Sequence, residues 1–206
     1  MNKIFILLIF SINPFLISCG GTSFDNDLII EESSEAKNLN EVNRKGAFDY
    51  LNSIRDKPSA YSDQLGIDLS AVEKRDKLIW SEELAKAAYE KAKDMAERDY
   101  FAHIDPDGYG MNYKIDAAGF TLADYLLKSK TANNFESIAA GTNRNTGKIM
   151  IQQLIIDNGV SSLGHRKHLL GMTNFWADAE YCGIGFYKKL GSTYTYYMCV
   201  LIAKHE

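Results

Sequence analysis

The sequence predicts an α+β fold, and three observations support this class. Apolar residues recur at helical spacing in several segments of the first two thirds of the chain. Near the C-terminus, the segments YCGIGFYKK and STYTYYMCVLIA alternate at a period of two, which is typical of strands. No internal repeat is visible. Because helices come first and strands cluster late, the pattern favours α+β over an alternating α/β order.

Composition limits the class of protein and of partner. The 206 residues are enough for one domain with a substantial core. Charged residues make up 24% and hydrophobic residues 46%, as in globular proteins. The formal net charge is −4 and no Lys/Arg-rich run is present. We therefore expect no nucleic-acid partner, because binding phosphates requires a concentrated basic face.

Residues 1–18 are predicted to be a lipoprotein signal peptide. Lys3 is followed by an apolar run that is too short to span a membrane. The stretch LISC, residues 16–19, looks like a bacterial lipobox, so that cleavage would leave an acylated Cys19 as the first residue. The alternative is an ordinary secretory signal with an incidental cysteine. We expect an exported protein that a lipid anchor attaches to the cell envelope, at the outer membrane or the cell surface.

The spacer is predicted to comprise the acylated Cys19 and the polar, acidic residues up to 40, with a domain over residues 41–206. An alternative role for the acidic stretch is a sorting signal for surface export. The first helix is expected from Glu41 to about Pro58.

Further helices are indicated by capping residues and glycine stops. Ser81 is a suitable N-cap for a helix that ends near Asp99, and Thr146 for one over residues 147–157. Shorter helices are expected over residues 112–118 and from about His165. Small alanines on the buried stripe of the helix after Ser81 indicate close packing against another element.

The two C-terminal strands are predicted to form a hairpin whose sheet is covered on both faces, because both faces carry apolar side chains. A turn centred between Leu190 and Gly191 would place Cys182 opposite Cys199 at a non-hydrogen-bonded position, where side chains approach most closely. We therefore expect a disulfide between them, as exported proteins permit. A bulge would shift this register, and two separate buried thiols are the alternative.

Common catalytic signatures are mostly absent. The sequence has no H-E-x-x-H and no Walker loop, and GVSSLG has the wrong spacing for a nucleophile elbow. Four polar residues in unusual places remain as candidates. They are His103 before a tight loop, Glu136 in an apolar segment, Asp157 at a helix C-terminus and His165 at a helix start. Each also has an ordinary structural interpretation, such as helix-stop chemistry for Asp157.

His168 follows His165 by three residues, a spacing at which two histidines on one helix could share a metal. It also lies directly after Arg166 and Lys167, in what looks like a basic surface turn. Of these two interpretations we favour the second, and we expect His168 to be a surface residue.

Four ordered motifs resemble the CAP superfamily, whose domain is also called SCP and whose members include cysteine-rich secretory, venom allergen and pathogenesis-related proteins. The resemblance covers about residues 44–203. Its motifs are LIWSEELAKAAYEKAKDMAERDYFAHIDPDG, ESIAAG, GHRKHLL and CGIGF. Departures include Ser137 and His168, where the family commonly has asparagine.

The resemblance implies a three-layer α-β-α sandwich with a central antiparallel sheet. It also implies a cleft that holds two histidines and two acids, which by motif are His103, Glu136 and His165, with Asp157 as the second acid. Two imidazoles and two carboxylates suit zinc or a similar divalent ion. Without a metal, the acids can orient the histidines in a hydrogen-bonded structural network.

Two functions follow from the resemblance and from the absence of a nucleophile. The favoured one is a non-catalytic, lipid-anchored binding module, whose cleft takes a divalent metal, a small apolar ligand or a protein partner. The alternative is a metal-assisted hydrolase, similar to a peptidase, in which the metal activates water and Glu136 acts as the base.

Overall fold

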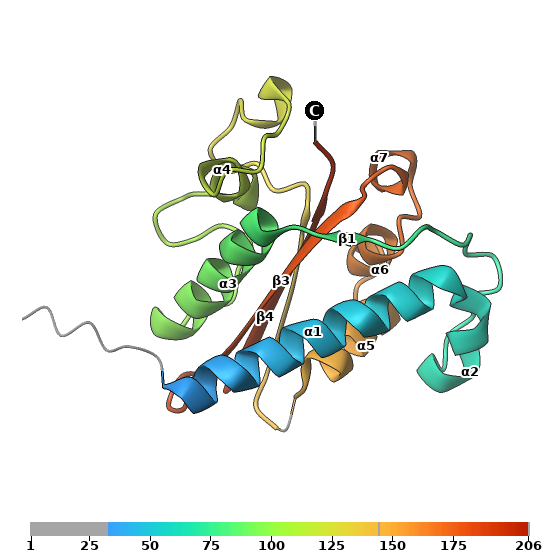
Figure 1. Cartoon of the computed structure of the whole chain (residues 1–206), viewed down its shortest axis with the longest axis horizontal. Coiled ribbons are helices and arrows are strands. Elements are labelled where there is room, and N and C mark those ends of the chain that lie inside the picture. Colours follow the sequence, from blue (N-terminus) through green and yellow to red (C-terminus); the bar gives the residue numbers. More distant parts are fainter. Residues whose placement is uncertain (1–32, 144, 206) are drawn as a thin grey trace, which may run out of the picture. The chain divides into compact units, whose positions relative to one another are not determined.

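The computed structural model describes residues 33–143 and 145–205. The predicted signal peptide, Cys19 and most of the predicted spacer therefore lie outside the described residues. Figure 1 shows the order of the elements. They are α1 Ser34–Asp56, η1 Pro58–Tyr61, α2 Ser62–Leu65, β1 Ile79–Trp80, α3 Glu82–Glu97, α4 Met111–Ala117, η2 Asp124–Leu126, β2 Glu136–Gly141, α5 Gly147–Ile156, α6 Gly164–Leu169, α7 Asn174–Ala177, β3 Tyr181–Lys188 and β4 Tyr196–Ala203.

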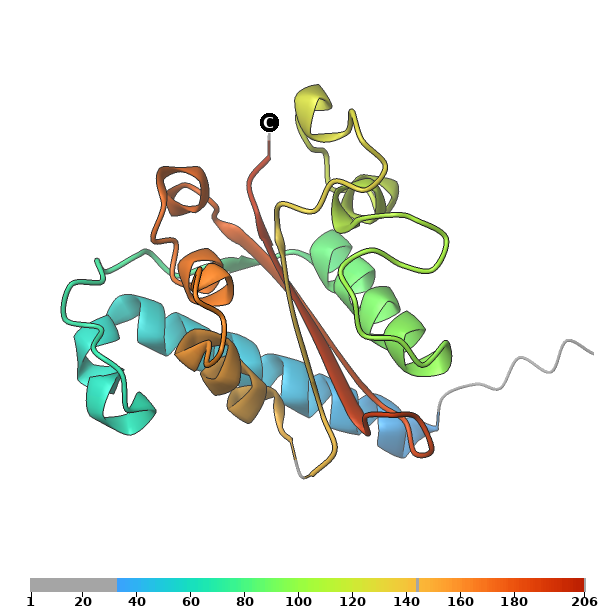
Figure 2. The same cartoon turned by 180° about the vertical axis from the view of Figure 1, so that it is seen from behind.

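A four-stranded sheet with the order β1-β3-β4-β2 lies at the centre of the fold. Strands β2, β4 and β3 pair antiparallel, as predicted, and the two-residue β1 joins the edge parallel to β3. Helices α1, α5 and α6 cover one face, and α3 and α4 cover the other, as Figures 1 and 2 show from opposite sides. The predicted α+β sandwich is confirmed, with a mixed rather than a purely antiparallel sheet.

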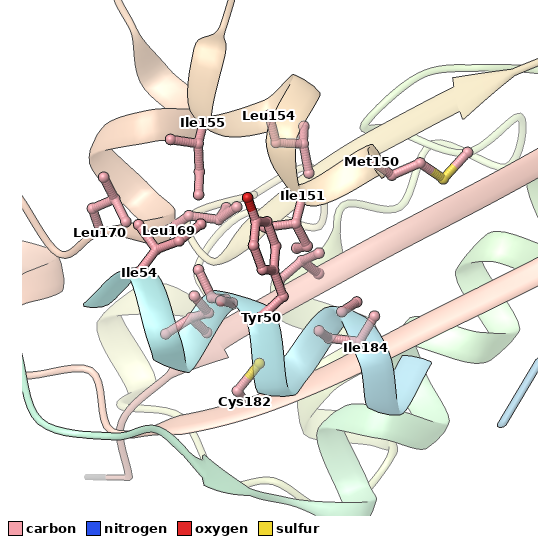
Figure 3. Packing of buried hydrophobic residues seen from close by; sticks show 14 of the residues in the cluster. Tyr50, Ile54, Met150, Ile151, Leu154, Ile155, Leu169, Leu170, Cys182 and Ile184 are labelled. Carbon is pink, nitrogen blue, oxygen red and sulfur yellow. The ribbon is translucent and has the colours of Figure 1, made fainter. Parts of the chain in front are cut away.

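The two faces of β4 belong to two separate hydrophobic clusters. Met198, Val200 and Ile202 pack under α1 and α5, in the cluster that Figure 3 shows from close by. The residues between them, such as Cys199 and Leu201, pack under α3 and α4. Successive side chains of β4 therefore pack alternately against the two helical layers. This confirms the prediction of a sheet covered on both sides.

The predicted disulfide is wrong, because Cys182 and Cys199 are free and buried on opposite faces of the sheet. Cys182 pairs with Ile202, and Cys199 pairs with Gly185. The connection between Lys188 and Tyr196 is longer than the tight turn assumed for the prediction. Paired positions therefore differ from the expected ones by an odd number of residues, which moves one cysteine to the other face.

The capping contacts confirm the predicted starts of α3 and α5. The side chain of Ser81 accepts a hydrogen bond from the Leu84 amide, and that of Thr146 accepts one from Ile149. Helix α1 begins at Ser34 instead of Glu41, so residues 34–40, which were assigned to the spacer, are helical.

Among the described residues, none of the helices has both the length and the apolar character needed to cross a membrane.

Helix α3 lies directly on the backbone of β3. A Cβ atom added to Gly183 would come within 2.1 Å of the Ala85 nitrogen, and one added to Gly185 within 2.2 Å of the Ala88 carbonyl. Real Cβ atoms do not approach so closely. The glycines of the CGIGF motif and the alanines of α3 thus permit the close packing that the alanine stripe predicted.

Candidate functional site

Glu136, the first residue of β2, holds the imidazole of His103. The His103 Nδ1 lies 2.6 Å from Glu136 Oε2, and Asn133 Nδ2 donates to the same oxygen at 3.1 Å. The Cys199 thiol lies 3.6 Å from the other oxygen. The Glu136 side chain is 0% exposed, whereas that of His103 is 44% exposed. The carboxylate therefore lies beneath a histidine that faces solvent.

A second carboxylate holds His165 in the same way. Asp157 ends α5 in the left-handed backbone region, with φ of 53°, and its Oδ1 lies 2.7 Å from His165 Nδ1. Its Oδ2 accepts the backbone N–H groups of His165 and Arg166 at 3.0 and 3.2 Å. These contacts stabilise a negative charge that the helix dipole makes unfavourable at a helix C-terminus. They also fix where α6 begins relative to α5.

The two histidine rings lie face to face, with centroids 6.4 Å apart and planes inclined by 29°. Because each Nδ1 donates to a carboxylate, each neutral ring keeps its lone pair on Nε2. Neither Nε2 has a hydrogen-bond partner among the described residues. The structure thus brings together all four residues selected from the sequence, as two carboxylate–histidine pairs. We refer to His103, Glu136, Asp157 and His165 as the histidine site.

A comparison with protein-family models identifies the family of this chain. The family model described as CAP, the cysteine-rich secretory protein family, matches residues 48–201, which is well over half of the chain. The chain belongs to the CAP family. A comparison with curated proteins found no match.

Three solved structures are similar to this CAP domain. An extracellular protein containing a SCP domain from Bacillus anthracis str. Ames has 23% identity and a TM-score of 0.55; the match covers 84% of this chain and 44% of that one. An outer surface protein from Borrelia burgdorferi has 15% identity and a TM-score of 0.46, with coverage of 79% and 95%. The CAP domain of enterococcal PrgA has 17% identity and a TM-score of 0.42, with coverage of 84% and 65%. The chain therefore spans less than half of the Bacillus protein, and that likeness supports the fold alone.

The donor set of this CAP domain limits how a metal could bind. The carboxylates orient the imidazoles through Nδ1, which is the usual outer-shell arrangement around metal-bound histidine. Among the described residues, no cluster of three or more His, Cys, Asp or Glu side chains is suited to hold an ion. His103 and His165 would supply two nitrogen ligands, and water would complete the coordination. This set fits an exchangeable ion better than a structural zinc, which takes four protein ligands.

The expectation that His168 lies at the surface is wrong. His168 is 2% exposed, and its Nε2 lies 3.4 Å from the carbonyl oxygen of Ile202. Because a carbonyl only accepts, Nε2 carries the proton, and Nδ1 accepts a 2.8 Å hydrogen bond from the Ser137 hydroxyl. This bond joins α6 to β2, one helical turn after His165 and one residue after Glu136. It therefore helps set the distance between the two halves of the histidine site.

Lys91 also supports the site, and the sequence analysis missed it because it lies on the apolar stripe of α3. It is 1% exposed, and its Nζ donates to the carbonyl oxygens of Ala102 at 2.8 Å and His103 at 3.1 Å. Burial lowers the pKa of Lys91, while the negative charge of Glu136 opposes this. Lys91 thus holds the backbone that carries His103.

We expect Lys91→Met to destabilise the domain by about 1–3 kcal/mol, because the two carbonyls lose their buried donor. Urea unfolding measures this loss, and Lys93→Met is the matched control because Lys93 is exposed on the same helix. Equal stability of the two variants would show that Lys91 does not hold the loop.

Proposed function

We propose that this CAP domain is an exported binding module whose histidine site takes a divalent metal ion, zinc above all. The observation that carries the proposal is the pair of stacked imidazoles, each with Nδ1 fixed by a buried carboxylate and with no partner for Nε2 among the described residues. A histidine held in this way is oriented for metal binding before the ion arrives. The ligands of a divalent ion would be His103 and His165.

The setting of the module is part of the same proposal. The Bacillus protein with the similar fold is extracellular, and the N-terminal sequence of this chain has the features of an export signal with a lipobox. We propose that cleavage leaves an acylated Cys19, which attaches the domain to the cell envelope. Residues 20–33 would then separate the lipid anchor from α1.

Exposed apolar side chains that lie close to His103 in the chain suit a ligand or partner in addition to the ion. Phe101 and Ile104 flank His103 in the chain, and each is 43% exposed. A small apolar ligand or a protein partner could contact these side chains while the ion contacts the imidazoles. Binding at the site would then depend on both the metal and the apolar neighbours.

The hydrolase alternative is less well supported by the geometry. A general base must reach the water that it deprotonates. The Glu136 side chain has no exposed surface, and both of its oxygens have partners within the domain. Its contacts suit an orienting role toward His103. We therefore favour the binding module over the hydrolase.

Calorimetric titration of the domain, residues 33–206, with zinc chloride tests the proposal. We expect one saturable site per chain, abolished in the His103→Ala, His165→Ala double variant. Circular dichroism of the double variant should retain the wild-type spectrum, because both rings are partly exposed.

The matched control is His205→Ala, which removes an exposed histidine that stacks on Phe120 outside the histidine site. It should bind zinc as the wild type does. Absence of zinc binding by the wild type, or equal binding by the double variant, would remove the metal proposal. Turnover of peptide or ester libraries that disappears in the double variant would favour the hydrolase instead.

A further inference from the structure

Arg55, near the C-terminal end of α1, is a buried cation without a carboxylate partner among the described residues. It is 2% exposed, and its Nη1 donates to the carbonyl oxygen of Leu169 at 2.9 Å. Its Nε is buried and has no hydrogen-bond partner. Burial lowers the pKa of Arg55 to about 10, so the side chain is still charged at neutral pH. A buried charge in this state is costly unless an anion or another acceptor is supplied.

Arg55 borders a surface hollow of about 400 Å³, formed by residues 74–77 and 177–180. Arg75 lines this hollow and a second one of about 240 Å³, which Thr173 also lines. The Arg75 Nε and the Thr173 hydroxyl are likewise buried without a partner. One donor atom of each of these three side chains is therefore unpaired: Arg55 lines the first hollow, Thr173 the second and Arg75 both. The Arg75 Nη2 is paired with Glu73 at 3.0 Å, so only its Nε lacks a partner. Native proteins leave few such groups unsatisfied.

The charges around the hollows differ between the interior and the rim. Acidic side chains at the rim are exposed, and Asp178, whose side chain is 74% exposed, lies 3.7 Å from Lys204. The outer basic residue Lys74 is already paired with Asp56 at 2.5 Å. The most deeply buried charged group in the lining is the Arg55 guanidinium. Asp76, Asp178 and Glu180 also line this hollow, all three from exposed positions, and the charge of Asp76 acts on Arg55. An anion at the hollow would therefore be attracted by the buried Arg55 and opposed by carboxylates that lie nearer the solvent.

We propose that Arg55, Arg75 and Thr173 form a binding site for a small tetrahedral oxyanion, such as phosphate or the phosphate group of a larger molecule. Guanidinium groups bind phosphate oxygens through directed, charge-assisted hydrogen bonds. A tetrahedral anion presents oxygens in several directions, which suits donors that come from α1, from the segment before β1 and from the segment before α7. None of these residues belongs to the histidine site, so the proposal does not depend on metal binding.

The test is calorimetric titration of residues 33–206 with sodium phosphate at constant ionic strength, with thermal unfolding in the same buffers. We expect saturable binding and a rise in melting temperature that sodium chloride at equal ionic strength does not produce. Titration with glycerol 3-phosphate distinguishes a phosphomonoester from the free ion, and binding of either supports the site. A response to acetate without a response to phosphate would overturn the tetrahedral assignment.

Two variants identify the site. Thr173→Val removes one hydroxyl at nearly constant volume, and Arg75→Gln removes one guanidinium from a partly exposed position. We expect each to weaken phosphate binding about tenfold or more, because each removes a donor to a charged group. Lys86→Gln, an equal charge change on the exposed face of α3, should bind like the wild type. Absence of phosphate binding by the wild type, or equal affinity in all three variants, would overturn the proposal.

Discussion

Gly185→Ala is expected to destabilise this CAP domain by about 3 kcal/mol, which is at the upper end of the usual cost of overpacking. The added methyl group would lie 2.2 Å from the carbonyl carbon and oxygen of Ala88 and 2.3 Å from the Tyr89 nitrogen. All three are backbone atoms of α3, so no side chain can rotate away. The helix would have to move off the sheet, which would separate Ala88 and its neighbours from Cys199 and Leu201 on that face.

Gly46→Ala is the matched control for this change. Gly46 lies within α1, and nothing would meet its added methyl group within 4 Å. Alanine at an exposed helical position should stabilise the domain by about 0.5–1 kcal/mol. Urea unfolding of both variants therefore should give changes of opposite sign. A Gly185→Ala variant as stable as the wild type would show that α3 does not rest on the β3 backbone as described.

Helices and strands could be predicted from the sequence because their signals are local. Ser81 and Thr146 cap their helices through atoms three residues away, and the alternation in β4 depends only on neighbouring side chains. The start of α1 was placed seven residues too late, because residues 34–40 are polar and give little periodic signal. Ser33, which accepts a hydrogen bond from the Ala36 amide, was the capping signal that could have found it.

The register of the hairpin could not be predicted, because it depends on contacts made by the connecting loop. The Thr195 amide donates to the carbonyl oxygen of Gly141, and the Lys189 backbone amide donates to the carbonyl oxygen of Thr195. These bonds link the loop to the end of β2, which is distant in the sequence. Gly191 does adopt a positive φ of 88°, as a turn requires, but it is not at the centre of a two-residue turn. The disulfide prediction was wrong for this reason.

The histidine site shows the same division between local and long-range information. The motifs selected His103, Glu136 and His165, and the helix-end position selected Asp157, all of which lie in the two carboxylate–histidine pairs. Lys91 and His168 were missed or misassigned because their role depends on partners elsewhere in the chain. His168 looked exposed beside Arg166 and Lys167, although a position one turn after His165 on a packed helix could equally face the sheet.

Acidification from pH 7 to pH 5 is expected to destabilise the domain by about 2 kcal/mol through His168 alone. The pKa of His168 is lowered to about 3, mainly by burial. The hydrogen bond to the Ile202 carbonyl opposes this shift, and the charges of His165, Arg55 and His103 add to it. The unfolded chain, with an imidazole pKa of about 6.5, therefore binds more protons than the folded chain between pH 6.5 and pH 3. Stability is full above pH 6.5 and falls as the pH decreases through this window.

Replacement of His168 separates this contribution from that of the carboxylates. His168→Asn cannot take up a proton, and its amide can still pair with the Ser137 hydroxyl, so it should unfold with a much smaller loss between pH 7 and pH 5. His205→Ala, which removes an exposed histidine, should keep the wild-type pH dependence. Urea unfolding at the two pH values measures all three proteins. If His168→Asn lost as much stability as the wild type, the buried imidazole would not be the acid-sensitive group. The Ser137–His168 contact would then join α6 to β2 without making the stability of the domain sensitive to acid.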